Sequence, residues 1–278
     1  MGTSHRHTPT VVGEPNWGNA SAAVTNIAKA EGKLNELGKE QENDKPKKTA
    51  AQIAKRQQQL DSQIQRNYHK AVRYLVKAAG GRSKVSSGAS RAIGHAGINI
   101  AIGFVSTVSD IINNGLTDWL GRRGVMSLEG ESCQNVLDLI RNYIEDDVAG
   151  LDNTAANEAL EYVLDELGQK IGEDLSSFEN AMNALMTSND IKDLLDKFFG
   201  MYIFSHLSQN FKEKLEYERG TKVMRETMNE IKELIIDDIQ RCNSGKDTLC
   251  IDWSAEEGKA FVKEEFDRIV YILSGNED

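Results

Sequence analysis

Apolar side chains return every three or four positions along most of this chain, which is the spacing of an amphipathic helix. The longest run lies in residues 49–79, where seven apolar positions follow this spacing: Ile53, Leu60, Ile64, Tyr68, Val72, Leu75 and Val76. Gly80 and Gly81 come next and favour a helix end, because glycine tolerates the left-handed conformation of a C-terminal cap. The pattern therefore predicts one long helix over residues 49–79.

The same spacing recurs through the second half of the chain. It predicts four or five further helices, over residues 132–149, 153–172, 189–217, 221–242 and 254–274. In the last segment, Ser254 and Glu257 have the separation of a capping box, in which each side chain binds the backbone N–H of the other residue. We therefore expect Ser254 to cap the start of the final helix.

Residues 86–114 form the least polar part of the chain. Small residues recur along one face of the helix expected there, so another backbone can approach closely: Ser90, Gly94, Gly97 and Ala101. His95 and Asn99 interrupt the apolar run, which is shorter than the roughly 20 apolar residues of a membrane span. We expect a helix buried in the protein core and no membrane association.

The first 45 residues differ from the rest of the chain. Residues 1–18 have no hydrophobic period and are interrupted by glycine and proline, which predicts a mobile tail with Trp17 as its only large apolar anchor. The Ala-rich residues 19–38 suit a weak helix, and residues 39–48 suit a charged, solvated linker. All three prolines lie within the first 46 residues, so the remainder suits long helices.

These patterns predict an all-α multi-helix bundle with a mobile N-terminal tail. We divide the chain into a flexible tail and weak helix over residues 1–45, a basic helical segment containing the small-residue helix over 46–125, and an acidic helical bundle over 126–278. Residues 46–278 are expected to form one globular unit. With 39% hydrophobic and 27% charged residues, the composition excludes collagen-like and wholly disordered classes.

Cysteine usage bears on the cellular compartment. The three cysteines, Cys133, Cys242 and Cys250, are too few for a disulfide scaffold and form no C-x-x-C pair. The first residues also lack the apolar segment of a secretory signal. A reduced, cytoplasmic protein is therefore expected.

Charge is divided unevenly along the chain. Residues 1–125 carry a balance of +9 and residues 126–278 a balance of −19. Residues 45–91 hold 12 Lys and Arg against one acid, Asp61. This density suits either the neutralisation of several nucleic-acid phosphates or packing against the acidic half or an acidic partner, and both readings stay open. The candidate basic patch consists of Lys55, Arg56, Arg66, Lys70, Arg73, Lys77, Arg82, Lys84 and Arg91.

Motifs of catalysis and cofactor binding are absent from the sequence. It contains no P-loop, GxGxxG, GxSxG, HExxH or C-x-x-C. The five histidines are dispersed, so we expect no metal and no cofactor. His95 and His206 lie in apolar stretches, where hydrogen-bonded core histidines are commoner than catalytic ones. We expect a protein that is not an enzyme, and keep an unrecognised site near these histidines as a third hypothesis.

The amino terminus is a further candidate site. Gly2 is small enough to allow removal of Met1, which leaves a free α-amine with a pKa of about 7.7–8.0. Such an amine is partly deprotonated, and therefore nucleophilic, at neutral pH. Arg6 stands where myristoylation requires Ser or Thr, which disfavours a lipid anchor.

Four segments of the chain resemble one known family. They are the opening MGTS, the tail residues PNW at 15–17, the segment AVRYLVKAAGGRSKVSSGASRAIGHAG, and the closing IDWSAEEGKAFVKEEFDRIVYIL. In this order they resemble the QatB family of the four-component Qat antiphage defence systems. The resemblance implies a non-catalytic component of a bacterial defence complex, whose partners are an ATPase, a QueC-like enzyme and a TatD-like nuclease.

The resemblance also implies a role for the tail. The QueC-like partner is similar to enzymes that handle 7-deazaguanines. This similarity implies that Gly2, after Met1 removal, accepts a covalent 7-deazaguanine on its amine. Thr3, Ser4 and Trp17 are then expected to be recognised by that partner. Our first hypothesis is thus a protein substrate and adaptor. The second is a nucleic-acid-binding subunit that recruits the nuclease or ATPase through residues 45–91.

Overall fold

A computed structural model of the chain describes residues 15–41, 49–125, 132–145, 148–172, 178–187, 190–242 and 251–275. Within these ranges the chain forms α-helices joined by turns and short loops, without a strand. The prediction of an all-α fold is confirmed. The tail expected at the N-terminus lies outside the described residues as far as position 14.

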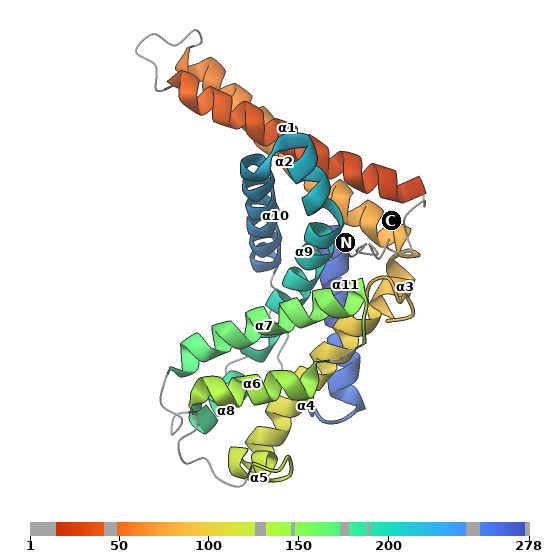
Figure 1. The fold of residues 1–278 in the computed structure, drawn as a ribbon, viewed down its shortest axis with the longest axis vertical. Coiled ribbons are helices and arrows are strands. Elements are labelled where there is room, and N and C mark those ends of the chain that lie inside the picture. Colours follow the sequence, from red (N-terminus) through yellow and green to blue (C-terminus); the bar gives the residue numbers. More distant parts are fainter. Residues whose placement is uncertain are drawn as a thin grey trace, which may run out of the picture.

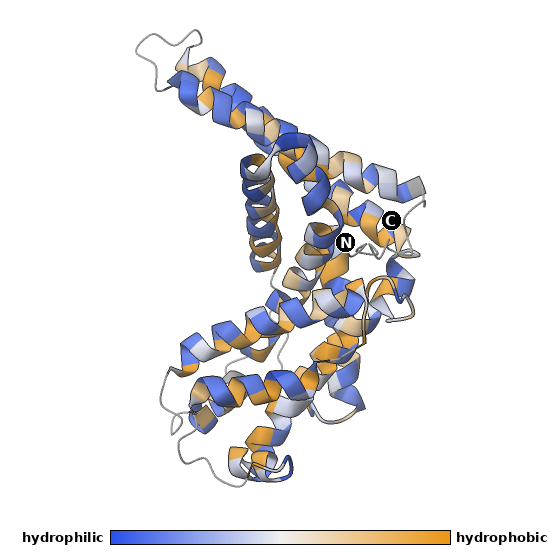
Figure 2. Ribbon diagram, viewed as in Figure 1, coloured by the Kyte–Doolittle hydropathy of each residue, from blue (hydrophilic) through white to orange (hydrophobic). Residues whose placement is uncertain are grey.

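The first two helices form an antiparallel hairpin, here called the arm, whose far end projects from the rest of the molecule (Figure 1). It consists of α1 (Pro15–Gln41) and α2 (Ala50–Ala78). Hydrophilic and hydrophobic residues alternate along both helices of the arm (Figure 2). Small buried side chains on α1 allow the helices to pack closely: Ala20, Ala23, Ala28 and Ala30.

The arm begins earlier in the chain than expected. α1 starts at Pro15, so the prediction that residues 15–18 belong to the tail is wrong. Proline suits the first turn of a helix because its missing N–H has no helical partner there and its φ is already helical. The Trp17 ring packs on Phe211 of α9 (Asp190–Arg219), with 5.2 Å between ring centroids. This contact ties the start of α1 to the rest of the molecule.

The boundaries of α2 agree with the predicted helix over residues 49–79. Thr49 and Gln52 form a capping box, in which the Thr49 hydroxyl accepts from the Gln52 N–H and the Gln52 side chain accepts from the Thr49 N–H. After α2, Gly80 and Gly81 adopt φ values of 103° and 91°. The helix therefore ends at the glycines that the sequence indicated.

The remaining helices, here called the body, begin with α3 (Arg82–Ser86), α4 (His95–Asn114) and α5 (Leu116–Gly121). The helix expected over residues 86–114 starts only at His95. Gly94 breaks it, because its φ is 112° and a Cβ there would clash with the Val85 carbonyl oxygen. α4 is long and apolar enough to cross a membrane, but 61% of its apolar window is buried inside the fold. Its placement in the core is as predicted.

The body continues with α6 (Cys133–Ile144), α7 (Leu151–Ile171), α8 (Phe178–Thr187), α9, α10 (Thr221–Arg241) and α11 (Glu256–Leu273). The sequence predicted all of these except α8. The predicted capping box of the last helix is wrong: Ala255 occupies the cap position, and Ser254 instead binds the carboxylate of Asp252 through its hydroxyl and backbone N–H. A short Asx turn thus takes the place of the side-chain cap.

One contiguous apolar core connects the arm with the body. It reaches from Val24 in α1, through Phe104 in α4 and Tyr202 in α9, to Val262 in α11. Of the helices, α9 contacts the largest set of neighbours, namely α1, α2, α4, α7, α8, α10 and α11. Its middle is buried on all sides, which explains why its apolar residues do not form a single stripe.

Candidate functional site

The proposed reactive residues precede the described part of the chain. Gly2, Thr3 and Ser4 lie among residues 1–14, outside the described ranges. Trp17 is half-buried against Phe211, so it has a packing role at the entry to the fold. The chain enters the fold at the base of the arm, at the opposite end of α1 from the arm's far end (Figure 1).

The last turn of α11 completes the base of the arm. The His69 ring nitrogen Nδ1 lies 3.1 Å from the carbonyl oxygen of Leu273, and Arg73 Nε donates to that of Ser274 at 3.0 Å. Both carbonyls belong to the C-terminal end of α11, where the helix leaves them without intrahelical partners. Arg73 of the candidate basic patch therefore holds α11 against α2.

Arg82 is likewise used inside the fold. Its guanidinium donates two hydrogen bonds to the Asp267 carboxylate, one of them 2.8 Å long, and lies over the Tyr271 ring. Arg82 holds the pKa of Asp267 below its usual value. For Arg73 and Arg82, the interpretation that basic residues pack against the C-terminal half is therefore correct.

The other cations of α2 have a different setting. Each of them is exposed, and none forms an ion pair with a carboxylate in the part of the chain that the structure describes: Lys55, Arg56, Arg66, Lys70 and Lys77. Arg56 donates to the Gln59 side chain and Arg66 to the Ser62 carbonyl, both on α2 itself. Lys84 and Arg91, also exposed, follow in α3 and the loop after it. The structure thus divides the predicted patch into a bound part and a free part.

Acidic side chains gather on another side of the arm. Glu31 of α1 faces Glu226 and Glu230 of α10, and Asp61 of α2 lies near the same group. Burial, followed by repulsion from Glu230, raises the pKa of Glu31 to about 7. Asn35 relieves part of this repulsion by donating to Glu226 at 3.1 Å. The arm therefore carries opposite charges on two sides.

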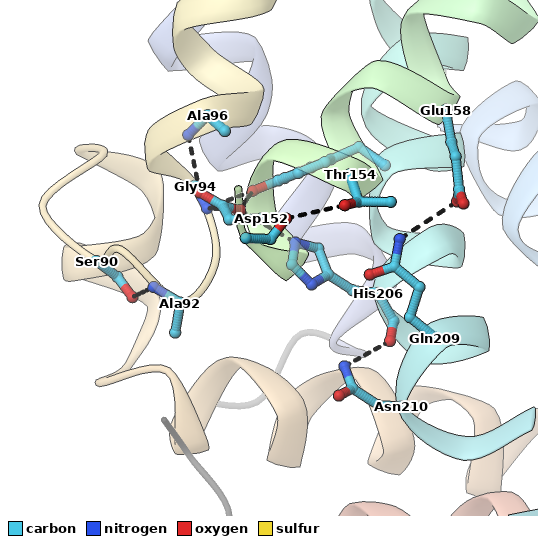
Figure 3. Close-up of polar contacts among 12 residues, drawn as sticks. Ser90, Ala92, Gly94, Ala96, Asp152, Thr154, Glu158, His206, Gln209 and Asn210 are labelled. Atoms are coloured by element: carbon cyan, nitrogen blue, oxygen red, sulfur yellow. Dashed lines mark hydrogen bonds and ion pairs between the residues drawn. The ribbon is translucent and has the colours of Figure 1, made fainter. Parts of the chain in front are cut away.

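A buried polar network joins three helices of the body (Figure 3). Asp152, in the first turn of α7, accepts hydrogen bonds from the backbone N–H groups of Gly94 at 3.3 Å and Ala96 at 2.8 Å. These N–H groups belong to the start of α4, which has no side-chain cap of its own. Asp152 thus caps α4 from another helix and places a negative charge at the positive end of its dipole.

Two residues of α9 complete this network. The Tyr202 hydroxyl donates to Asp152, and His206 Nε2 lies 3.1 Å from the same carboxylate oxygen. Burial opposes ionisation of Asp152, but the contacts with His206, followed by Tyr202 and the Ala96 N–H, hold its pKa below the usual value. Burial, and then the Asp152 charge, raise the pKa of Tyr202 well above that of free tyrosine, so it remains a donor.

The burial of this network argues for a structural role. Asp152 is 5% exposed, His206 1% and Tyr202 0%, so a substrate reaches them only if helices separate. His206 is the buried, hydrogen-bonded core histidine that the sequence indicated. The expectation for His95 is wrong: its side chain is exposed, and its Nδ1 lies 3.1 Å from the Gly88 carbonyl oxygen.

The sequence gave no indication of a second buried network, between α9 and α11. Lys192 binds Asp196 at 2.8 Å and Glu265 at 3.2 Å, and Arg268 bridges both carboxylates. Burial and Glu265 raise the pKa of Asp196 to about 7. Although burial acts in the opposite direction, hydrogen bonds with Asp196 and Arg268 lower that of Glu265 to about 2. The signals in the sequence are the four-residue spacing of Lys192 and Asp196 and the three-residue spacing of Glu265 and Arg268, and both spacings also occur on exposed helix faces.

Two further features bear on binding. A cavity of about 440 Å³ lies among α7, α9 and α10, and its lining includes Asp196, Tyr162, Met201 and Ile239. Among the described His, Cys, Asp and Glu residues, no group of three or more is arranged to hold a metal ion. Of the cysteines, Cys133 is buried and Cys242 is exposed, while Cys250 lies outside the described residues.

Comparison with known protein families assigns the chain to one of them. The model of the family described as "Qat anti-phage system associated protein QatB" matches residues 80–273, more than two thirds of the chain. The chain belongs to the QatB family. It is therefore a component associated with the Qat antiphage system, as the resemblance implied. No curated protein and no solved structure matches it.

The QatB match has a clear structural boundary. It begins at Gly80, directly after α2, and ends at Leu273, the last residue of α11. Both buried networks lie inside the matched region, whereas the arm and its exposed cations lie outside it. The body is thus the part of this chain that the family model describes.

Proposed function

We propose that this QatB-family chain is a non-catalytic subunit of a Qat complex that serves as both protein substrate and adaptor. After removal of Met1, a QueC-like partner attaches a 7-deazaguanine to the amine of Gly2 and recognises Thr3 and Ser4 beside it. The family match is the observation that carries this proposal. The burial and pairing of Asp152 and Asp196, two perturbed polar groups of the body, support a non-catalytic role.

The point of entry into the fold supports an adaptor role. Trp17 fixes the start of α1 to α9, and fourteen residues precede α1. An extended chain of that length spans at most about 46–50 Å, which is enough to enter the active site of a docked enzyme. The body then supplies the docking surface, while the amine supplies the nucleophile for the deazaguanine that the partner activates.

Mass spectrometry tests this proposal directly. We expect the chain expressed alone to lack Met1 and carry a plain Gly2, and the chain expressed with the QueC-like, ATPase and nuclease partners to carry an added mass on the N-terminal peptide. Thr3→Ala and Ser4→Ala should each reduce the modified fraction, whereas Thr8→Ala serves as a control in the same segment. A plain Gly2 in the presence of all partners contradicts the proposal.

A second candidate function is favoured by one specific observation. Lys55, Arg66, Lys70 and Lys77 have no carboxylate partners among the described residues, so packing against the acidic half does not account for them. The chain in this case binds nucleic acid through the basic segment and brings the nuclease or ATPase to it. Binding that weakens steeply with added salt is the expected result, and salt-independent binding contradicts it.

A further inference from the structure

The free cations of α2 form a continuous stripe along the arm. At about 100° per residue, Lys55, Arg66, Lys70 and Lys77 lie within about 60° of one another around the helix axis. The distance along the helix from Lys55 to Lys77 is about 33 Å, at 1.5 Å per residue. This group is called the stripe below, and Arg56 lies at its edge.

Within α2, no acidic residue lies on the same face as the stripe. Gln59 and Ser62 fill the interval between Lys55 and Arg66, and both are uncharged. The only acid in α2, Asp61, falls on a different side of the helix, toward the acidic residues of α10. At the Lys55 end, Glu36 and Glu40 of α1 line the same pocket as Lys55. Over the rest of the stripe, a long anion meets the cations and uncharged hydrogen-bonding side chains of α2.

We propose that the stripe binds the phosphate backbone of duplex nucleic acid over about one helical turn, without reading the base sequence. This inference rests on the second candidate function above and assigns its site. Its length of about 33 Å matches the roughly 34 Å of one turn of B-DNA. Lysine, the most frequent residue of the stripe, contacts phosphate as a flexible point charge, which gives affinity without base specificity.

The aromatic residues of α2 favour a duplex over a single strand. Proteins that bind single strands stack the bases on exposed aromatic rings. The aromatic rings of α2 belong to Tyr68, which is fully buried, and Tyr74, which is half-buried and packs on the core. The stripe thus offers contacts to phosphates and no described stacking surface for bases.

The charges on the other sides of the arm restrict how a polyanion can approach. Glu31, Glu226 and Glu230 lie where the arm meets α10, and they repel phosphate. The nucleic acid is therefore held on the outer face of the arm, away from the acidic side of the body. In this position it lies beside the base of the arm, where Lys77 is close to the start of the body.

The test compares two variants of the full chain that lose the same number of charges. The stripe variant is K55Q/R66Q/K70Q/K77Q. The control variant K170Q/K212Q/R225Q/K263Q removes four exposed cations from α7, α9, α10 and α11. Fluorescence anisotropy with labelled duplexes of about 20 base pairs, in two unrelated sequences, and with one isolated strand measures affinity across a range of salt concentrations.

We expect the wild-type chain to bind both duplexes equally and more tightly than the single strand. The stripe variant should reduce the slope of log affinity against log salt by about 3 to 4, since each lost phosphate contact accounts for about 0.9. Its affinity at about 100 mM salt should fall at least about 30-fold, and that of the control variant by less than about threefold.

Other outcomes overturn the inference and separate it from the functions above. If the chain binds duplex but the stripe variant binds as well as the control, nucleic-acid binding stands and the assigned site is wrong. If the wild-type chain binds neither duplex, both the second candidate function and the proposal for the stripe fail. If the stripe variant binds duplex normally but loses a Qat partner in a pull-down, the stripe is a docking surface for an acidic protein. The mass of Gly2 in the coexpressed stripe variant reports the modification independently.

Discussion

The arm and the body use their charged residues in opposite ways. In the body, Asp152, Asp196 and Glu265 are buried and paired with residues from other helices. On the outer face of the arm, Lys55 and Lys70 stay in solvent and have no described carboxylate partners. Removing one partner of a buried pair leaves an uncompensated charge, whereas exposed charges contribute little to stability. In the body, charged groups therefore connect helices that an apolar core packs together, while on the outer face of the arm they remain available to a binding partner.

The strongest test of this comparison removes the carboxylate that caps α4. Asp152→Ala leaves two backbone N–H groups, Tyr202 and His206 without their acceptor, so we expect the free energy of unfolding to fall by about 3–5 kcal/mol. Asp165→Ala, an exposed position of the same helix, should change it by less than about 0.5 kcal/mol. Urea denaturation followed by circular dichroism measures both.

The pH dependence of the same variant provides a second readout. Because the folded pKa of Asp152 lies below its usual value, its stabilising contribution is present at neutral pH and is lost as the pH falls through that folded pKa. The difference between wild type and Asp152→Ala should therefore shrink in acid. A difference that stays constant down to about pH 2 contradicts the assignment.

If His206→Gln abolished defence without loss of stability, the catalytic hypothesis would be revived.

Alanine substitutions at two glycines, one in the body and one in the arm, should have effects of intermediate size on stability. A Cβ on Gly97 in α4 would lie 2.7 Å from the Tyr202 ring, whereas one on Gly32 in α1 meets nothing within 4 Å. Gly97→Ala should destabilise the fold by about 1–3 kcal/mol through overpacking. Gly32→Ala should stabilise it by up to about 1 kcal/mol, because alanine has the higher helix propensity. Thermal unfolding distinguishes the two, and the same sign for both contradicts the packing described.

The smallest expected effect lies at the junction of the arm with α10. The pKa of Glu31 is raised to about 7, so the stability linked to its protonation is present below its unfolded value of 4.5 and is lost as the pH rises through about 7. Glu31→Gln should raise Tm by about 1–2 °C at pH 8, with the gain declining toward pH 5. Glu36→Gln, an exposed change on the same helix, is the control. An equal gain at both pH values contradicts the repulsion.

The sequence predicted the long helices because their local patterns are strong. The apolar period and the glycines around α2 determine its length, and neither depends on the rest of the fold. The failures have a tertiary cause. Residues 15–18 are helical because Trp17 packs on Phe211, which lies far along the chain. The helix before His95 is interrupted because Gly94 packs on the Val85 carbonyl.

The candidate sites divide in the same way. The stripe follows from helical spacing alone, so it could be read from the sequence once the bounds of α2 were known. Whether a cation is free depends on distant residues, and Arg82 meets Asp267 only in the fold. The Asp152 network joins residues that lie about 50 positions apart along the chain, which no local pattern encodes. Predictions for Gly2, Thr3 and Ser4 remain untested, since these residues precede the described ranges.

Leu273 and Ser274 close the base of the arm, so the arm can close only after these late residues have been synthesised. A ribosome adds about 5–20 residues each second, so about 14–54 seconds pass between the synthesis of Gly2 and that of the residues that lock α11 onto α2. In the function proposed above, Met1 is removed from the growing chain. Gly2 would then be exposed for processing well before the base of the arm is complete, and an enzyme that recognises both the amine and the closed arm would act only on finished chains.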